Sequence, residues 1–349
     1  MRGRRGGLAA RVGVLGAFAL AVGLLFASSA SASGWVFKET FGSANVPTFV
    51  KPLALAVDQS SGDLLVVDAG AKTISRFKPN GEPDPFSALA GSNVIDGLGG
   101  ADETPPPHGL EVSSFAQEVQ IAVDDSGGVA DGDIYLTQSG RHVVYVFRSD
   151  GTFLKQLTTS SEGAFGEICG TSVDGAGNLY LGDFGGHIHK FAPTSNSPYE
   201  ATNTANFPFA EACTLAAGAG PTAGFLFANH YNGELFKLDA GSGASKYKVA
   251  TSDVTVAANP ANGHVFAPKE SEVREYDASG PTAPTEPIEH FPPHVSSNVR
   301  GVAVDGASKL LYLANSVSST IEVWKEQGAL PIVETSPAEA IEVEGATLI

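Results

Sequence analysis

The chain alternates short apolar runs with clusters of Gly, Asn, Asp, Ser and Pro, and a helical period of 3.6 is nearly absent. This pattern is typical of an all-β protein with many tight turns. One small-residue phrase recurs: AVD or SVD at Ala56–Asp58, Ala122–Asp124, Ser172–Asp174 and Ala303–Asp305, with degenerate copies at Ala216–Gly218 and Val256–Asn259. Each copy precedes a strand-like run: Leu64–Asp68, Ile134–Thr137, Leu179–Asp183, Phe225–Asn229, His264–Ala267 and Leu310–Asn315. Regular repetition of this kind indicates one supersecondary unit copied side by side.

Six units follow from this register. They span Phe49–Gly91, Phe115–Gly163, Ala164–Asn206, Phe207–Thr251, Ser252–Pro292 and Pro293–Gly328. In each unit a third strand containing an aromatic residue follows the second, and most units add a fourth. Four short antiparallel strands per unit predict a blade of a β-propeller, since radial repetition leaves few exposed strand edges. We therefore expect a six-bladed propeller with four-stranded antiparallel blades.

The sixth unit lacks a fourth strand, because the chain turns away after Trp324. An alternating segment, Trp35–Gly42, stands before the first unit and has the pattern of a closing strand. We predict that it completes the sixth blade. Ser92–Ser114 is predicted to be a long loop between the first two blades, with either a functional role or simple tolerance of insertion.

The motif Phe-x-x-Pro, AVD, Gly-x-Leu, then Ile-x-x-Phe, best kept in Phe49–Gly81, resembles that of NHL-repeat proteins and the gluconolactonase-like six-bladed propellers. The resemblance covers residues 35–328, and the fourth and fifth units depart from it by losing the Asp of the phrase. It implies the propeller fold. It leaves function open, because that superfamily includes binding scaffolds, lactonases and lyases.

The first 32 residues have the features of a secretory signal peptide: four arginines, an apolar run over Val12–Ala27, and small residues suited to cleavage after Ala32. A membrane anchor is the alternative, although the run is shorter than the roughly 20 residues of a spanning helix. We expect a secreted or cell-surface protein without stable membrane insertion. Ala329–Ile349 is either the truncated start of an immunoglobulin- or fibronectin III-like domain or a plain terminal tail.

The formal net charge is −17, and the predicted leader holds four of the 21 basic residues and none of the 38 acidic ones. So acidic a mature chain argues against a nucleic-acid partner. Cys169 and Cys213 occupy matched positions in neighbouring units. An oxidising compartment favours a disulfide between them; the alternative is two buried free thiols.

The repeated Asp is interpreted as structural. Asp58, Asp124, Asp174 and Asp305 end strands just before tight turns, where an Asp side chain accepts backbone N–H bonds.

Candidate metal ligands stand six or seven residues upstream, where the first strands begin. They are Glu118, Glu167, Glu211, Asp253 and Asn298. Equivalent positions in a propeller form a ring at one channel mouth, and Ca²⁺ prefers several such oxygen ligands. The gluconolactonase-like resemblance also implies a divalent ion at a mouth. The alternative is a set of solvated carboxylates in an acidic protein.

The first strands carry no His, and no hydrolase or phosphate-binding motif occurs. The sequence therefore favours an exported, non-catalytic binding or scaffold propeller that recognises a protein or glycan. The alternative is a Ca²⁺-dependent lactonase- or lyase-type enzyme that uses the carboxylate ring, and a passive spacer in a surface adhesin is a third interpretation.

Overall fold

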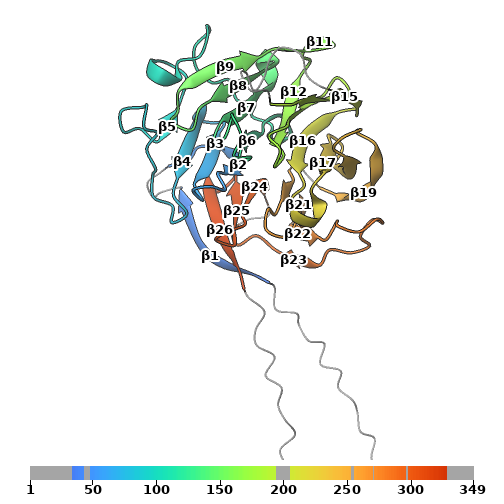
Figure 1. Ribbon diagram of the computed structural model, residues 1–349. Coiled ribbons are helices and arrows are strands. Elements are labelled where there is room, and N and C mark those ends of the chain that lie inside the picture. Colours follow the sequence, from blue (N-terminus) through green and yellow to red (C-terminus); the bar gives the residue numbers. More distant parts are fainter. Residues whose placement is uncertain are drawn as a thin grey trace, which may run out of the picture. The chain divides into compact units, whose positions relative to one another are not determined.

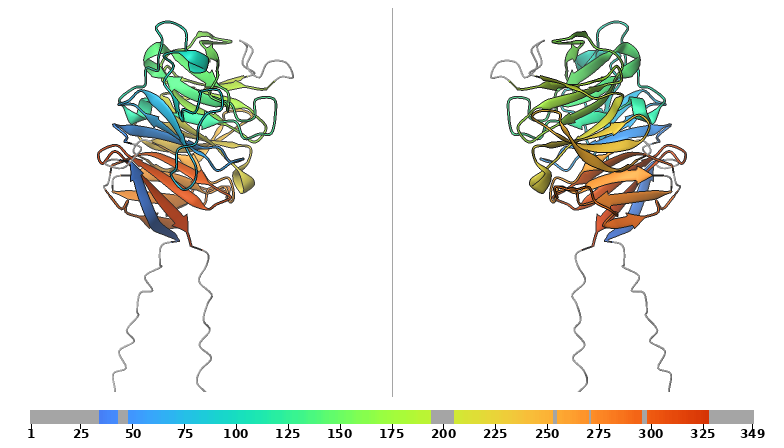
Figure 2. Two further views of the ribbon diagram at one scale, coloured as in Figure 1. Left: turned by 90° about the vertical axis from the view of Figure 1, so that its left-hand side faces the viewer. Right: turned by 90° about the vertical axis from the view of Figure 1, so that its right-hand side faces the viewer.

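A computed structural model describes residues 34–42, 48–193, 205–252, 255–269, 271–295 and 298–327. Six four-stranded antiparallel sheets stand around a common centre (Figures 1 and 2), so the predicted six-bladed β-propeller is confirmed. The predicted signal peptide 1–32, the tail 329–349 and the candidate ligand Asp253 lie outside the described residues.

The first strand of every blade lies nearest the centre, and the other three follow outwards. The first strands are β2 (Pro52–Val57), β6 (Ile121–Val123), β12 (Ile168–Val173), β16 (Ala212–Ala217), β20 (Ala257–Ala258) and β24 (Val299–Asp305). The second strands are β3 (Leu64–Asp68), β7 (Ile134–Gln138), β13 (Leu179–Asp183), β17 (Phe225–His230), β21 (Val265–Lys269) and β25 (Leu310–Asn315). Three of these second strands have the bounds that the apolar runs predict.

The outer half of each blade is less regular. The third strands are β4 (Thr73–Phe77), β8 (Val143–Phe147), β14 (His187–Phe191), β18 (Glu234–Asp239), β22 (Glu272–Tyr276) and β26 (Thr320–Glu326). The fourth strands are β5 (Val94–Ile95), β9 (Phe153–Leu157), β15 (Ala205–Pro208), β19 (Ser245–Thr251), β23 (Glu289–Phe291) and β1 (Trp35–Gly42). The remaining elements are a hairpin, β10 (Thr159–Ser160) and β11 (Gly163–Ala164), and four 3₁₀ turns, η1 (Gly100–Asp102), η2 (Ala116–Glu118), η3 (Ser139–Arg141) and η4 (Gly220–Thr222).

The N-terminal strand closes the ring as predicted: β1 pairs antiparallel with β26 (Figure 1). Its two ends also contact the neighbouring blades. The Trp35 indole N–H donates to Glu275 Oε2 of the fifth blade at 2.8 Å. At the other end, the Phe41 ring packs against Phe77 of the first blade, with ring centroids 5.4 Å apart. One strand therefore joins three blades.

The fourth strand of the first blade lies beyond the predicted unit Phe49–Gly91. It is β5, within the segment expected to be an inter-blade loop, where Ile95 pairs with Ile74 of β4. After Phe77 the chain makes an excursion that buries Phe86 completely before it returns. A two-residue strand carries no alternation, so the sequence pattern placed the end of the blade too early.

The hydrophobic core of the described residues is divided among the blade interfaces. Six apolar clusters lie one between each pair of adjacent blades. Small residues allow the closest approach between the third and fourth blades. A Cβ added at Gly182 would lie 2.2 Å from the Ala212 carbonyl oxygen, and one at Gly170 would lie 3.0 Å from Leu215.

This close packing predicts that Gly182→Ala destabilises the protein, because backbone on the facing blade has to move. We expect a loss of about 1–3 kcal/mol in the free energy of unfolding, measured by denaturant titration. Gly175→Ala is the matched control, since its Cβ would meet nothing within 4 Å. Equal stability of the two variants would contradict the close-packed interface.

Candidate functional site

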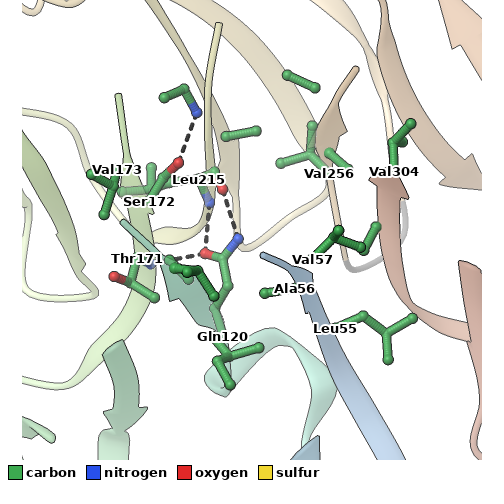
Figure 3. A pocket seen from close by; sticks show the side chains of 18 of the residues that line it. Leu55, Ala56, Val57, Gln120, Thr171, Ser172, Val173, Leu215, Val256 and Val304 are labelled. Carbon is green, nitrogen blue, oxygen red and sulfur yellow. Dashed lines mark hydrogen bonds between the residues drawn. The ribbon is translucent and has the colours of Figure 1, made fainter. Parts of the chain in front are cut away.

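A pocket of about 310 Å³ occupies the centre of the propeller (Figure 3). The first strands of all six blades contribute to its lining. Its walls are mainly aliphatic, with Val57, Val173, Val256 and Val304 among them. This follows from the repeated small-apolar phrase, which places one short apolar strand of every blade next to the axis.

The Gln120 side chain lines this pocket on the side where Thr171 and Leu215 lie (Figure 3). Its Oε1 accepts the backbone N–H of Thr171 at 2.8 Å and of Leu215 at 2.9 Å, while its Nε2 donates to the Leu215 carbonyl at 2.6 Å. One amide thereby joins the second, third and fourth blades. Beside it, Ser172 Oγ accepts the backbone N–H of Ala217 at 2.8 Å. These side chains pair with backbone groups that the first strands present at their inner edges.

We call the end of the pocket where the first strands finish the mouth. There the residue directly after the repeated Asp, or after its substitute, lines the mouth in five blades. These residues are Gln59, Asp125, Gly175, Ala219 and Pro260. Gln59 bridges two blade interfaces, because its Nε2 donates to the Val304 carbonyl at 2.8 Å and its backbone N–H donates to Asp125 Oδ1 at 2.8 Å.

Asp125 is the one charged residue among those five. It is exposed within the mouth but has protein on most sides. This partial desolvation, together with the neighbouring Asp58 and Asp131 carboxylates, raises the pKa of Asp125 to about 7, against the lowering effect of the Gln59 N–H. The mouth thus holds an acid that titrates near neutral pH.

The repeated Asp side chains make the turn contacts that their structural interpretation predicts. Asp58 Oδ1 accepts the backbone N–H of Ser60 at 2.9 Å, and Asp124 Oδ1 that of Ser126 at 2.9 Å. The same contact is made by Asp174 with Ala176 and by Asp305 with Ala307. Asp174 also accepts the Tyr180 hydroxyl at 2.9 Å, which holds the turn against the second strand.

The candidate metal ligands that are described lie where the first strands begin, as predicted, but none of them lines the pocket. Glu118 Oε2 accepts the Ser113 hydroxyl at 2.6 Å, and Glu211 Oε2 lies 3.3 Å from His230 Nδ1. Glu167 and Asn298 are partly buried. Within the described ranges, no three His, Cys, Asp or Glu side chains come together in a group that would hold a metal ion. The calcium site stays a prediction, because its Asp253 is not described.

Cys169 and Cys213 are both buried, and both are free thiols in this structure. Each stands at a register shift, where the first strand of its blade bulges against the second. Cys169 Sγ donates to the Ala212 carbonyl at 3.5 Å. The neighbouring Cys213 thiol and burial raise the pKa of Cys169 well above its usual range. The matched repeat positions therefore do bring the cysteines together, and the disulfide stays a prediction.

No protein-family model matches the chain, and no curated protein matches its sequence. Within the described residues, no helix has both the length and the apolar character to span a membrane.

Sequence reasoning missed Gln120, Gln59 and Asp125. The repeat register holds a signal for each of them. Gln120 is a long polar residue where other units carry Ala54, Gly170 or Thr214. Asp125 is the one acid that follows the repeated Asp or its substitute in any unit. A departure from the repeat, rather than the repeated residue, marks the groups at the pocket.

We expect Gln120→Leu to lower the free energy of unfolding by about 1–3 kcal/mol, since it leaves buried backbone groups of two blades without partners. Denaturant titration measures the change. Gln156→Leu, at an exposed position of β9, is the control and should change stability little. A Gln120→Leu protein as stable as the control would show that this amide does not hold the blades together.

The paired thiols give a second test. Protein isolated from an oxidising compartment and denatured without reductant should show no free thiol, because oxidation during folding precedes burial of the protonated thiols. The Cys213→Ser and Cys169→Ser variants should each then show one free thiol per chain. Two free thiols in the unaltered protein would contradict the disulfide.

Proposed function

We propose that this protein is an exported, non-catalytic β-propeller that binds a protein partner on one face of the disc. The observation that supports this most directly is the position of its exposed apolar side chains. Six of the nine large exposed apolar residues in the described part of the chain belong to loops of a single face. They are Val50, Leu98, Phe115, Tyr231, Val295 and Val317.

The two faces follow from the strand order. Because the strands of a blade alternate in direction, loops before a first strand and loops between second and third strands share one face. We call this the entry face, and the opposite one the exit face. Val50, Leu98, Phe115 and Val295 stand before first strands, whereas Tyr231 stands between β17 and β18.

These side chains are well exposed. Val317, between β25 and β26, is 67% exposed, Leu98 65%, Phe115 61% and Val50 60%. Scattered apolar residues are normal on a soluble protein, but their gathering on one face is typical of an interaction surface. Aliphatic side chains gain binding energy by burying apolar area, which a protein partner offers. Glycan recognition relies more on aromatic rings, and only two of the six are aromatic.

The polar groups of the centre support a binding role over a catalytic one. All three hydrogen bonds of the Gln120 side chain go to backbone groups, and the carboxylates of Asp58, Asp174 and Asp305 accept backbone N–H groups of their own turns. Export is proposed on the leader pattern of residues 1–32. The NHL-like relationship is proposed on the repeat motif of Phe49–Gly81, together with the six-bladed fold.

The test compares the affinity for a partner of variants altered on the entry face and on the exit face. An entry-face variant carries Val50→Ser, Phe115→Ser and Val317→Ser, and a matched exit-face variant carries Val129→Ser and Ile288→Ser, which replace residues 59% and 52% exposed. Secreted proteins retained by the unaltered propeller are identified, purified and titrated against all three proteins. We expect the entry-face variant to lose at least tenfold in affinity and the exit-face variant to bind normally.

Equal binding by the entry-face variant, or loss in the exit-face variant alone, would contradict the proposal. A glycan array probed with the same three proteins tests the glycan alternative. If the unaltered protein binds a glycan and only the entry-face variant loses that binding, the ligand of the entry face is a glycan and not a protein. Far-ultraviolet circular dichroism and unfolding midpoints confirm that each variant is folded.

A further inference from the structure

We propose that the central pocket binds a small organic cation, with its apolar body between the first strands and its ammonium group at Asp125. This site is separate from the proposed partner surface on the entry face, because Asp125 and the turns beside it stand on the exit face. The proposed function leaves this pocket unused.

The walls fit an apolar body. Val57, Val173, Val256 and Val304 project around the same space (Figure 3). The volume of about 310 Å³ is at the lower end of the range for small-molecule sites. The Gln120 amide in the lining is already paired with Thr171 and Leu215, so it offers a bound molecule little further hydrogen bonding. The pocket is therefore lined mainly by aliphatic side chains, and the one basic residue of its described lining, Arg300, stands at the start of β24, at the end opposite Asp125.

The mouth fits a positive group. Asp125 lines it, and the charges that act most strongly on this carboxylate are those of Asp58 and Asp131, both acidic. Asp174 lines the same mouth from the third blade. A cation bound here relieves the repulsion among these carboxylates, whereas an anion would add to it.

An organic ammonium ion fits better than a hard metal ion. Calcium takes six to eight oxygen ligands, and the described acids of the mouth do not form a metal-binding group. Asp58 Oδ1 is engaged by the Ser60 hydroxyl and the Ser60 backbone N–H, and Asp174 by its own turn. Of the two acids that line the mouth, Asp174 is engaged in its own turn, and the remaining carboxylate of Asp125 suits a molecule with one charged end.

Binding should depend on pH in a defined direction. Partial burial and the neighbouring acids hold the pKa of Asp125 at about 7, so it is largely neutral at pH 5.5 and ionised at pH 8.5. An alkylammonium group, with a pKa of about 10 like that of Lys, stays charged at both values. Affinity should therefore rise with pH across this interval, and binding should release protons near pH 7.

The experiment uses three probes with the same ring: phenethylamine, 2-phenylethanol and 3-phenylpropanoate. Each is titrated calorimetrically against the unaltered protein, Asp125→Asn and Asp150→Asn. Asp125→Asn keeps an oxygen acceptor for the Gln59 N–H but removes the charge. Asp150→Asn is the matched control, since Asp150 accepts the Thr152 N–H in an exit-face turn outside the pocket.

We expect phenethylamine to bind at least tenfold more tightly than 2-phenylethanol, as a charge-assisted hydrogen bond implies. Asp125→Asn should remove that advantage, and Asp150→Asn should preserve it. Methyl resonances of Val57, Val173 and Val304 should shift on binding, which locates the ligand even if Asp125→Asn fails to fold. The affinity of the unaltered protein should fall between pH 8.5 and pH 5.5.

Three results would overturn the proposal: affinity for phenethylamine weaker than about 1 mM, equal affinity for the amine and the alcohol, or shifts confined to residues outside the pocket. Undiminished binding by folded Asp125→Asn would do so as well. None of these outcomes bears on the entry-face partner, so the two proposals fail separately.

Discussion

The inner edges of the six first strands are the constraint on which this propeller depends. A first strand pairs with the second strand of its own blade on one side only, so its other edge presents backbone N–H and C=O groups to the centre. Unpaired buried groups of this kind are costly. Gln120, Ser172 and Gln59 pair with several of them from neighbouring blades. Side-chain amides and a hydroxyl thus provide at the centre the cross-links that no strand can provide there.

The contacts that join adjacent blades differ with distance from the propeller axis. Near the axis, polar side chains bridge backbone edges. Farther out, the apolar clusters between adjacent blades supply the packing energy, and glycines such as Gly182 permit the closest approach. At the ring closure β1 adds both kinds of contact, since Trp35 donates to Glu275 on one side and Phe41 packs against Phe77 on the other.

The parts of the fold that repetition encodes are the parts that the sequence predicts. The predicted bounds are those observed for three second strands, Leu64–Asp68, Leu179–Asp183 and Leu310–Asn315. In each of them a continuous apolar run is flanked by turn residues, which fix where the strand begins and ends. The strand β5 escaped prediction because its two residues pair only after a long excursion. The bridge from Gln120 to Leu215 joins residues 95 positions apart, and no local pattern encodes such a contact.

At the candidate site, the residues repeated in every blade differ from the residues suited to recognise a ligand. A residue repeated in every blade meets a requirement common to every blade, as the turn contacts of Asp58, Asp174 and Asp305 illustrate. A ring of six equivalent groups has no preferred direction, whereas a ligand with distinct ends needs an asymmetric site. Asp125 provides that asymmetry, because the other four residues that follow the repeated position at the mouth are uncharged. The search for function in a repeat protein therefore belongs at the positions where one blade differs from the others.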